Sequence, residues 1–182
     1  MNKLPQKQKA VIGLEDGSLS VSSDVDVAQI EEHMVLIRTR TIGLNPIDTK
    51  MKGPLAAPGA IAGIDFAGEV VAIGSKSITP AKIRIGDRVF GATTGYQKPK
   101  PTLGAFAEFV TANSAGLLKI PEDWSFEQGA SLGCSISTIG LALFKSLNVP
   151  GTPKYPAEKP VDVFVYGGST TTGTMALQLL KM

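Results

Sequence analysis

The feature that most constrains the fold is the segment 161–173, where an apolar run ends in a turn rich in glycine and hydroxyl residues. β-Branched and aromatic residues lead into Gly167 and Gly168, and a helix-compatible stretch continues after Gly173. This order predicts a strand, a tight turn and a helix, which is the opening unit of a parallel α/β sheet.

The hydroxyl residues of this turn would lie at the N-terminus of the predicted helix, where free amide groups bind phosphate. Against the dinucleotide pattern G-x-G-x-x-G, the turn has Gly168 and Gly173 but carries Thr170 as its middle residue. An ordinary turn of a parallel sheet explains the glycines equally well, but it does not explain four consecutive hydroxyls. We therefore predict a phosphate site for a dinucleotide at the hydroxyl turn, which consists of Ser169, Thr170, Thr171 and Thr172.

Composition excludes several function classes. The 182 residues are 43% hydrophobic, and 18 basic and 16 acidic residues give a net charge of +2 without long runs. This balance predicts no binding of nucleic acid or of an acidic membrane. The only cysteine, Cys134, allows neither an intrachain disulfide framework nor a thiolate zinc cluster. Because no segment has the length of a membrane span and the N-terminal residues lack the core of a signal peptide, we expect a cytoplasmic protein.

The first hundred or so residues predict strands that are separated by glycine turns. Alternation of apolar residues and aromatics on one face indicates strands at residues 9–12, 34–40, 67–73 and 104–110. Such short strands favour a compact β-barrel. Trp124 and Tyr96 are isolated aromatic residues, which we expect to pack without a further function.

The first helix is expected to begin at Ser125, because Ser125 and Gln128 form the S-x-x-Q pattern of a capping box. Apolar residues then continue toward Leu147, which predicts a long helix. Four prolines between Val149 and Pro160 block regular structure and predict a stiff loop between two modules.

Three motifs resemble, in order and spacing, those of the medium-chain dehydrogenase/reductase superfamily: residues 43–48 (GLNPID), 63–65 (GID) with Gly68, and 86–89 (GDRV). More narrowly, four segments resemble the trans-acting enoyl reductases of fungal polyketide pathways: residues 45–51, 125–128, 137–142 and 165–170. The resemblance covers nearly the whole chain, but only about the first half of such an enzyme.

The resemblance implies a mostly β protein with some helix. Its expected parts are a GroES-like β-barrel catalytic domain at residues 5–150, a proline-rich linker at 151–160, and the start of a truncated Rossmann domain at 161–182. Zinc-dependent members place a cysteine and a histidine ligand where this chain has Asn45 and Ile64. Because a catalytic zinc needs about three ligands and the only histidine, His33, lies far from this motif, no metal is expected.

The resemblance also assigns roles to residues. It makes Lys50 and Thr138 catalytic, and it adds cofactor contacts at Ile47, Asp48, Thr49 and Lys50. It places the acyl chain along Ile139, Gly140, Leu141, Ala142, Leu143, Phe144, Lys145 and Ser146. From the residues alone, Lys50 would be a surface lysine, Thr138 would bond back to a helix carbonyl, and the stretch 139–146 would be core.

The implied function is an NADPH-dependent enoyl reductase that acts, as a monomer, on an acyl thioester carried by a polyketide synthase. NADPH does the hydride chemistry, so the protein has to align the reactants and stabilise charge at the thioester oxygen. Two alternatives remain open. The chain is a truncated and inactive reductase that serves as a binding domain, or it is a zinc-free reductase of quinones.

Overall fold

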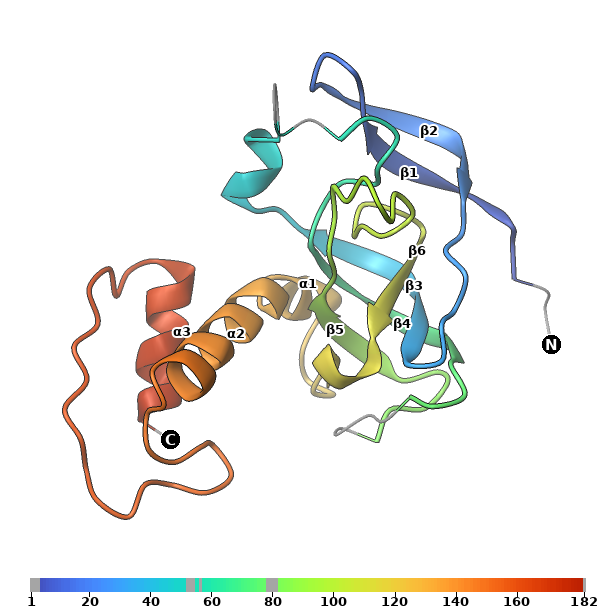
Figure 1. Ribbon diagram of the computed structural model, residues 1–182. Helices are drawn as coiled ribbons and strands as arrows, with labels where there is room; N and C mark the ends of the chain where they lie inside the picture. Colours follow the sequence, from blue (N-terminus) through green and yellow to red (C-terminus); the bar gives the residue numbers. More distant parts are fainter. Residues whose placement is uncertain (1–3, 52–54, 56, 78–81, 182) are drawn as a thin grey trace. The chain divides into compact units, whose positions relative to one another are not determined.

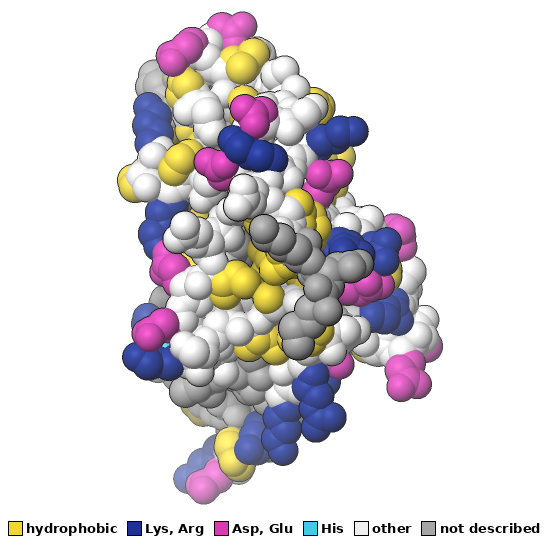
Figure 2. Space-filling model, turned by 90° about the vertical axis from the view of Figure 1, so that its right-hand side faces the viewer, with side chains coloured by type: hydrophobic (Ala, Val, Ile, Leu, Met, Phe, Trp, Pro, Cys, Tyr) yellow, Lys and Arg dark blue, Asp and Glu magenta, His cyan; other side chains and the backbone are white. Residues whose placement is uncertain are grey.

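The computed structural model describes residues 4–51, 55, 57–77 and 82–181. The chain divides into two compact units, residues 1–133 and 134–182. Strands dominate the first unit and helices the second (Figure 1). No helix within the described ranges is long and apolar enough to cross a membrane. Basic and acidic side chains are interspersed on the face that Figure 2 shows, with hydrophobic side chains between them.

The described residues of the first unit form two antiparallel sheets. The smaller sheet pairs β1 (Lys7–Gly13) with β2 (Leu19–Asp26). The larger sheet has the strand order β6-β3-β4-β5-β7, and its strands are β3 (Met34–Gly43), β4 (Asp65–Ile73), β5 (Arg88–Ala92), β6 (Phe109–Asn113) and β7 (Leu118–Lys119). Isolated bridges from Ala10 to Ala107 and from Ile12 to Ile61 join β1 to the segments around the larger sheet.

The core of the first unit lies on one face of β3 and β4. Phe66 and Ile37 are fully buried there, and Val70 is 1% exposed. Each such side chain contributes about 1.5–3 kcal/mol by leaving water. The central strands are therefore apolar, whereas β2, at the edge of its sheet, is mostly exposed.

Three of the four predicted strands are confirmed, because residues 9–12, 34–40 and 67–73 lie within β1, β3 and β4. The prediction for residues 104–110 is largely wrong, since only the last two of them belong to β6. The backbone of this segment bonds to two different neighbours: Ala105 N–H donates to Gly63 O, whereas Glu108 N–H donates to Lys9 O. A segment shared in this way forms no regular ladder with either neighbour.

The helix after Ser125 begins as predicted. Gln128 N–H donates to Ser125 Oγ at 3.3 Å, and Ser125 N–H donates to Gln128 Oε1 at 2.8 Å, which completes the capping box of α1 (Phe126–Ala130). The expected continuous helix is wrong, because the chain leaves helical geometry after α1 and resumes with α2 (Gly133–Gly140). The second helix starts where Gly133 lies so close to Gly91 that a Cβ would be 2.3 Å from the carbonyl oxygen.

In the second unit, α2 continues into a π-helical stretch, Leu141–Ser146, in which Leu147 N–H donates to Ala142 O. Helix α3 (Thr171–Leu180) packs Ala176 against Ile139 and Leu143. Helices α2 and α3 lie side by side in Figure 1.

The strand expected before the glycine turn is not formed. Residues 161–165 pair with no strand in the part of the chain that the structure describes. A parallel strand requires neighbours for its N–H and C=O groups, and no described segment provides one. The mostly β architecture is confirmed, whereas the boundaries at residues 5, 150 and 160 stay a prediction.

Candidate active site

The turn after β3 is built by local hydrogen bonds. Asn45 is extended, Pro46 opens the 3₁₀ turn η1 (Pro46–Thr49), and proline suits this first position because its φ is already fixed. Asn45 N–H donates to Asp48 Oδ2 at 2.7 Å, while Asp48 N–H donates to Asn45 O at 2.9 Å. The turn is therefore closed by a reciprocal pair of hydrogen bonds.

Asp48 is a buried carboxylate whose two oxygens are both hydrogen-bonded. The second oxygen, Oδ1, accepts a hydrogen bond of 3.1 Å from the hydroxyl of Tyr96. Asp48 is 9% exposed and Tyr96 is 7% exposed. Burial raises the pKa of Tyr96 well above its usual value, and the negative charge of Asp48 raises it further. The phenol therefore stays protonated and donates across the neutral pH range.

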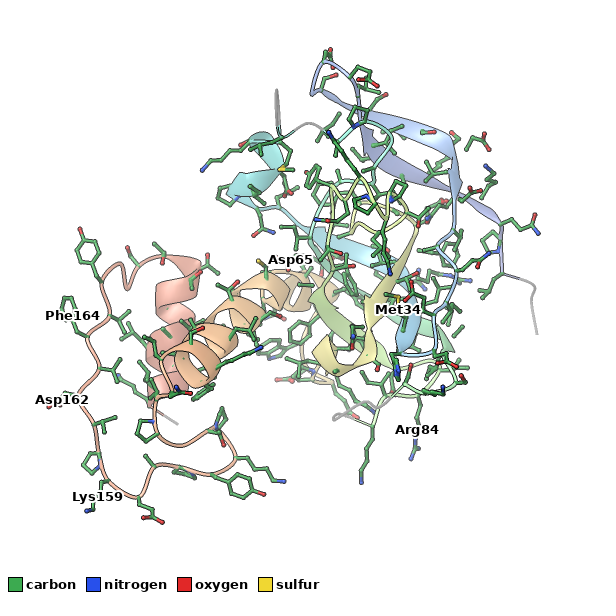
Figure 3. All side chains as sticks on the ribbon, in the orientation of Figure 1. Met34, Asp65, Arg84, Lys159, Asp162 and Phe164 are labelled. Carbon is green, nitrogen blue, oxygen red and sulfur yellow. The ribbon has the colours of Figure 1, made fainter. Side chains whose placement is uncertain are left out.

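A second polar bond connects the turn to the sheet. Asn45 Nδ2 donates to Asp65 Oδ2 at 2.8 Å, and Asp65, which Figure 3 labels, is 3% exposed at the start of β4. The amide of Asn45 thus connects the turn to the sheet, and the side chain of Ile64 has no donor atom for a metal. Among the residues that the structure describes, no group of three or more histidine, cysteine and acidic side chains is suited to hold a metal ion.

Lys50 ends this turn. Its N–H donates to Ile47 O at 2.9 Å, its side chain is exposed, and it makes no ion pair within the described ranges. Met51, the next residue, packs against the core of the first unit. Ile47 and Thr49 are exposed on the same turn, with Thr49 Oγ1 donating to Pro46 O at 3.0 Å. The turn thus presents an unpaired ammonium group next to a rigid backbone.

In the second unit, the glycine turn before α3 has the geometry of a capped helix start. Gly167 has a φ of +83°, which favours glycine, and Thr170 Oγ1 donates to Gly167 O at 2.9 Å. The same hydroxyl accepts from Gly173 N–H at 3.0 Å, so Thr170 is the N-cap of α3. A Cβ on Gly173 would lie 2.2 Å from Gly167 O, which explains the glycine at this position.

The other three members of the hydroxyl turn are differently placed. The hydroxyls of Ser169, Thr171 and Thr172 make no hydrogen bond to any described residue. The first amide groups of a helix also lack partners within the helix. The N-terminus of α3 therefore offers hydroxyl and amide donors together with the positive end of the helix dipole, an arrangement that fits a phosphate group.

Thr138 is exposed on α2, with Oγ1 3.8 Å from Cys134 Sγ. Of the stretch expected to bind the acyl chain, Ile139 and Leu143 are 8% and 3% exposed in the helix core, whereas Leu141 is 57% exposed. The remaining members are partly buried or exposed: Gly140, Ala142, Phe144, Lys145 and Ser146.

The structure brings the predicted residues together in two groups. Ile47, Asp48, Thr49 and Lys50 share one turn of the first unit, and Thr138, residues 139–146 and the hydroxyl turn belong to the second unit. Sequence reasoning missed Tyr96 and Asp65. Tyr96 lies 48 residues from its partner, so only the general tendency of a buried phenol to find a hydrogen-bond partner pointed to it.

Known proteins resemble this chain along its full length. Over 182 residues it is 50% identical to a trans-enoyl reductase of Gibberella zeae, of which it covers 51%. A trans-enoyl reductase of a Fusarium species is 50% identical over 177 residues, which are 97% of this chain and 50% of that relative. The chain thus spans about half the length of the curated relatives it matches.

Solved structures also resemble this chain in fold. A solved alcohol dehydrogenase superfamily protein from Novosphingobium aromaticivorans superposes with a TM-score of 0.71 at 26% identity, over 94% of this chain and 49% of that protein. The profile of the alcohol dehydrogenase GroES-like domain matches residues 31–122. The chain therefore belongs to the alcohol dehydrogenase GroES-like family, within the medium-chain dehydrogenase/reductase superfamily.

Proposed function

We propose that this chain provides the catalytic domain and the phosphate-binding turn of a trans-acting enoyl reductase that uses NADPH. The observation that carries the proposal is the start of α3, where Gly167 turns the backbone and Thr170 caps the helix. The remaining hydroxyls of the turn are then available for a pyrophosphate. The 50% identity to trans-enoyl reductases supports the reaction class.

The site residues have different roles in binding and in charge stabilisation. When bound, NADPH supplies the hydride that adds to the β-carbon of an α,β-unsaturated thioester. The ammonium group of Lys50 binds negative charge, either on the cofactor or on the thioester oxygen as the double bond is reduced. Thr138, the second predicted catalytic residue, has an exposed hydroxyl that is available to donate a hydrogen bond to the cofactor or the substrate. A proton added at the α-carbon completes the saturation of the double bond.

The chain's own groups do not fit a catalytic zinc. Asn45 donates its amide to Asp65 and thereby holds the turn, and Ile64 has no ligating atom. No step of the proposed reaction passes through a metal. Reduction of an activated double bond suits such a site, because the thioester already polarises the alkene and charge stabilisation by Lys50 is sufficient.

The substrate is an acyl thioester held by the carrier domain of a polyketide synthase. This part of the proposal rests on the similarity to trans-enoyl reductases of Gibberella zeae and Fusarium. Leu141 and Phe144 are apolar side chains of the π-helical stretch that keep some exposure, and they suit an alkyl chain. Ile139 and Leu143 are buried in the core of the second unit.

The test is NADPH oxidation, followed by absorbance, with a short 2-enoyl pantetheine thioester as substrate and a benzoquinone as the competing acceptor. The proposal expects oxidation that depends on the thioester and falls at least about tenfold in Lys50→Ala, because a hydrogen bond to a charged group contributes roughly 1.5–3 kcal/mol. Oxidation with the quinone alone would contradict it in favour of the quinone reductase. Failure to bind NADPH at all would favour a binding domain without catalysis.

A further inference from the structure

The buried carboxylate of Asp48 has no positively charged partner among the residues that the structure describes. Its two hydrogen bonds come from the backbone N–H of Asn45 and the hydroxyl of Tyr96, both neutral donors. A charged group that is 9% exposed needs its hydrogen bonds to offset the loss of water. The phenol is therefore essential to the placement of this carboxylate.

Tyr96 itself is fixed independently of the turn. Its N–H donates to Ile61 O at 2.9 Å, and its side chain belongs to the hydrophobic core around Phe66. Its φ of +60° is unusual for a residue that is not glycine. The phenol thus reaches Asp48 from a rigid part of the first unit.

The carboxylate determines the path of the backbone that leads to Lys50. Asp48 closes the turn Pro46–Thr49 by bonding to Asn45 N–H, and Lys50 follows two residues later with its own N–H bonded inside the turn. The Asn45–Asp65 bond anchors the turn on one side and the packing of Met51 anchors it on the other. Between these two anchors, the hydrogen bond from Tyr96 to Asp48 holds the middle of the turn.

We infer that Tyr96 is a positioning residue for Lys50: its hydroxyl holds Asp48, and Asp48 holds the turn in the conformation that presents the lysine ammonium. The inference rests on the proposed role of Lys50 and adds a residue that does not touch substrate or cofactor. Loss of the hydroxyl leaves the fold intact, but it loosens the turn that presents the ammonium group of Lys50.

The test is a double-mutant cycle on NADPH affinity with Tyr96→Phe and Lys50→Ala in the full chain. Tyr96→Phe weakens binding about fivefold when Lys50 is present and less than about twofold in the Lys50→Ala background, because residues that act as one unit are not additive. Equal losses in both backgrounds would overturn the inference. Thr111→Val is the matched control, since it also removes one buried hydroxyl from the first unit and should leave the affinity unchanged.

A second readout does not depend on the cofactor. Hydrogen exchange of the peptide that contains residues 45–50 is expected to rise several-fold in Tyr96→Phe and to stay unchanged in Thr111→Val. If the wild-type chain binds no NADPH, the proposed function fails and this readout alone decides the positioning role. Unchanged exchange in Tyr96→Phe would overturn the inference whether or not NADPH binds.

Discussion

The turn that carries Lys50 and the segment that leads into α3 are built in opposite ways. The first is fixed by bonds from distant parts of the chain, with Asp48 and Asp65 both buried and hydrogen-bonded. The second exposes Phe164 and Tyr166 by 89% and 94% and has no strand partner among the described residues. The comparison shows that a glycine turn and a helix cap form from local sequence, whereas the strand before them needs neighbours.

The largest effect is expected from a pair of phenylalanine variants. Phe66→Ala, in the core of the first unit, should lower the free energy of unfolding by about 3–5 kcal/mol. Phe164→Ala should change it by less than about 0.5 kcal/mol, because this side chain is exposed. Urea unfolding of the two variants measures the difference. A loss above about 1 kcal/mol in Phe164→Ala would mean that this segment is covered in solution.

Glycine variants sharpen the comparison within the second unit. Gly173→Ala places a methyl group 2.2 Å from Gly167 O and should lower the free energy of unfolding by about 1–3 kcal/mol. The same substitution should also weaken the binding of NADPH. Gly140→Ala meets nothing within 4 Å and should stabilise the chain by up to about 1 kcal/mol, since alanine favours helix. Thermal unfolding of both proteins checks the contrast. A tolerated Gly173→Ala would contradict the tight contact between α3 and its turn.

The buried phenol predicts an alkaline loss of stability. Because the pKa of Tyr96 is higher in the folded chain, its contribution is complete below the unfolded value near pH 10 and is lost as pH rises above it. By about pH 11 the loss should reach roughly 1 kcal/mol, and Tyr96→Phe should lack this component. Denaturant titrations measure the free energy of unfolding of the wild-type chain and of Tyr96→Phe. If this free energy changed with pH in the same way for both proteins, the burial of the phenol would be contradicted.

The smallest effect is expected at the surface of the first unit. A hydrogen bond from Lys119 lowers the pKa of Asp87, so this carboxylate stabilises the fold above its unfolded pKa of about 3.9 and loses the contribution as pH falls further. Asp87→Asn should lower the free energy of unfolding by about 0.5 kcal/mol at neutral pH and leave it unchanged at pH 2. A cost that persists unchanged in acid would show that the ion pair is not its source.

Local patterns in the sequence predicted what depends on near neighbours. The alternation in β3 and β4, the capping box at Ser125 and the glycine turn with its helix are all present. The absence of a catalytic zinc, which Asn45 and Ile64 led us to expect, stays a prediction.

Contacts between distant segments account for what the sequence did not predict. Residues 104–108 bond to two different neighbours, and the strand at 161–165 lacks a partner within the described ranges. The bond between Tyr96 and Asp48 joins residues that lie 48 positions apart, so their spacing did not indicate it. The buried positions of Ile139 and Leu143 depend in the same way on the packing of α3.

The most direct measurement is an isothermal titration of the chain with NADPH, with Lys50→Ala and Thr172→Val as comparisons. Our account predicts micromolar binding that both substitutions weaken, Lys50→Ala by loss of a charge and Thr172→Val by loss of a hydroxyl at the helix start. Binding that neither substitution changes would place the cofactor elsewhere. The absence of binding at millimolar NADPH would contradict the proposal that this chain holds a working cofactor site.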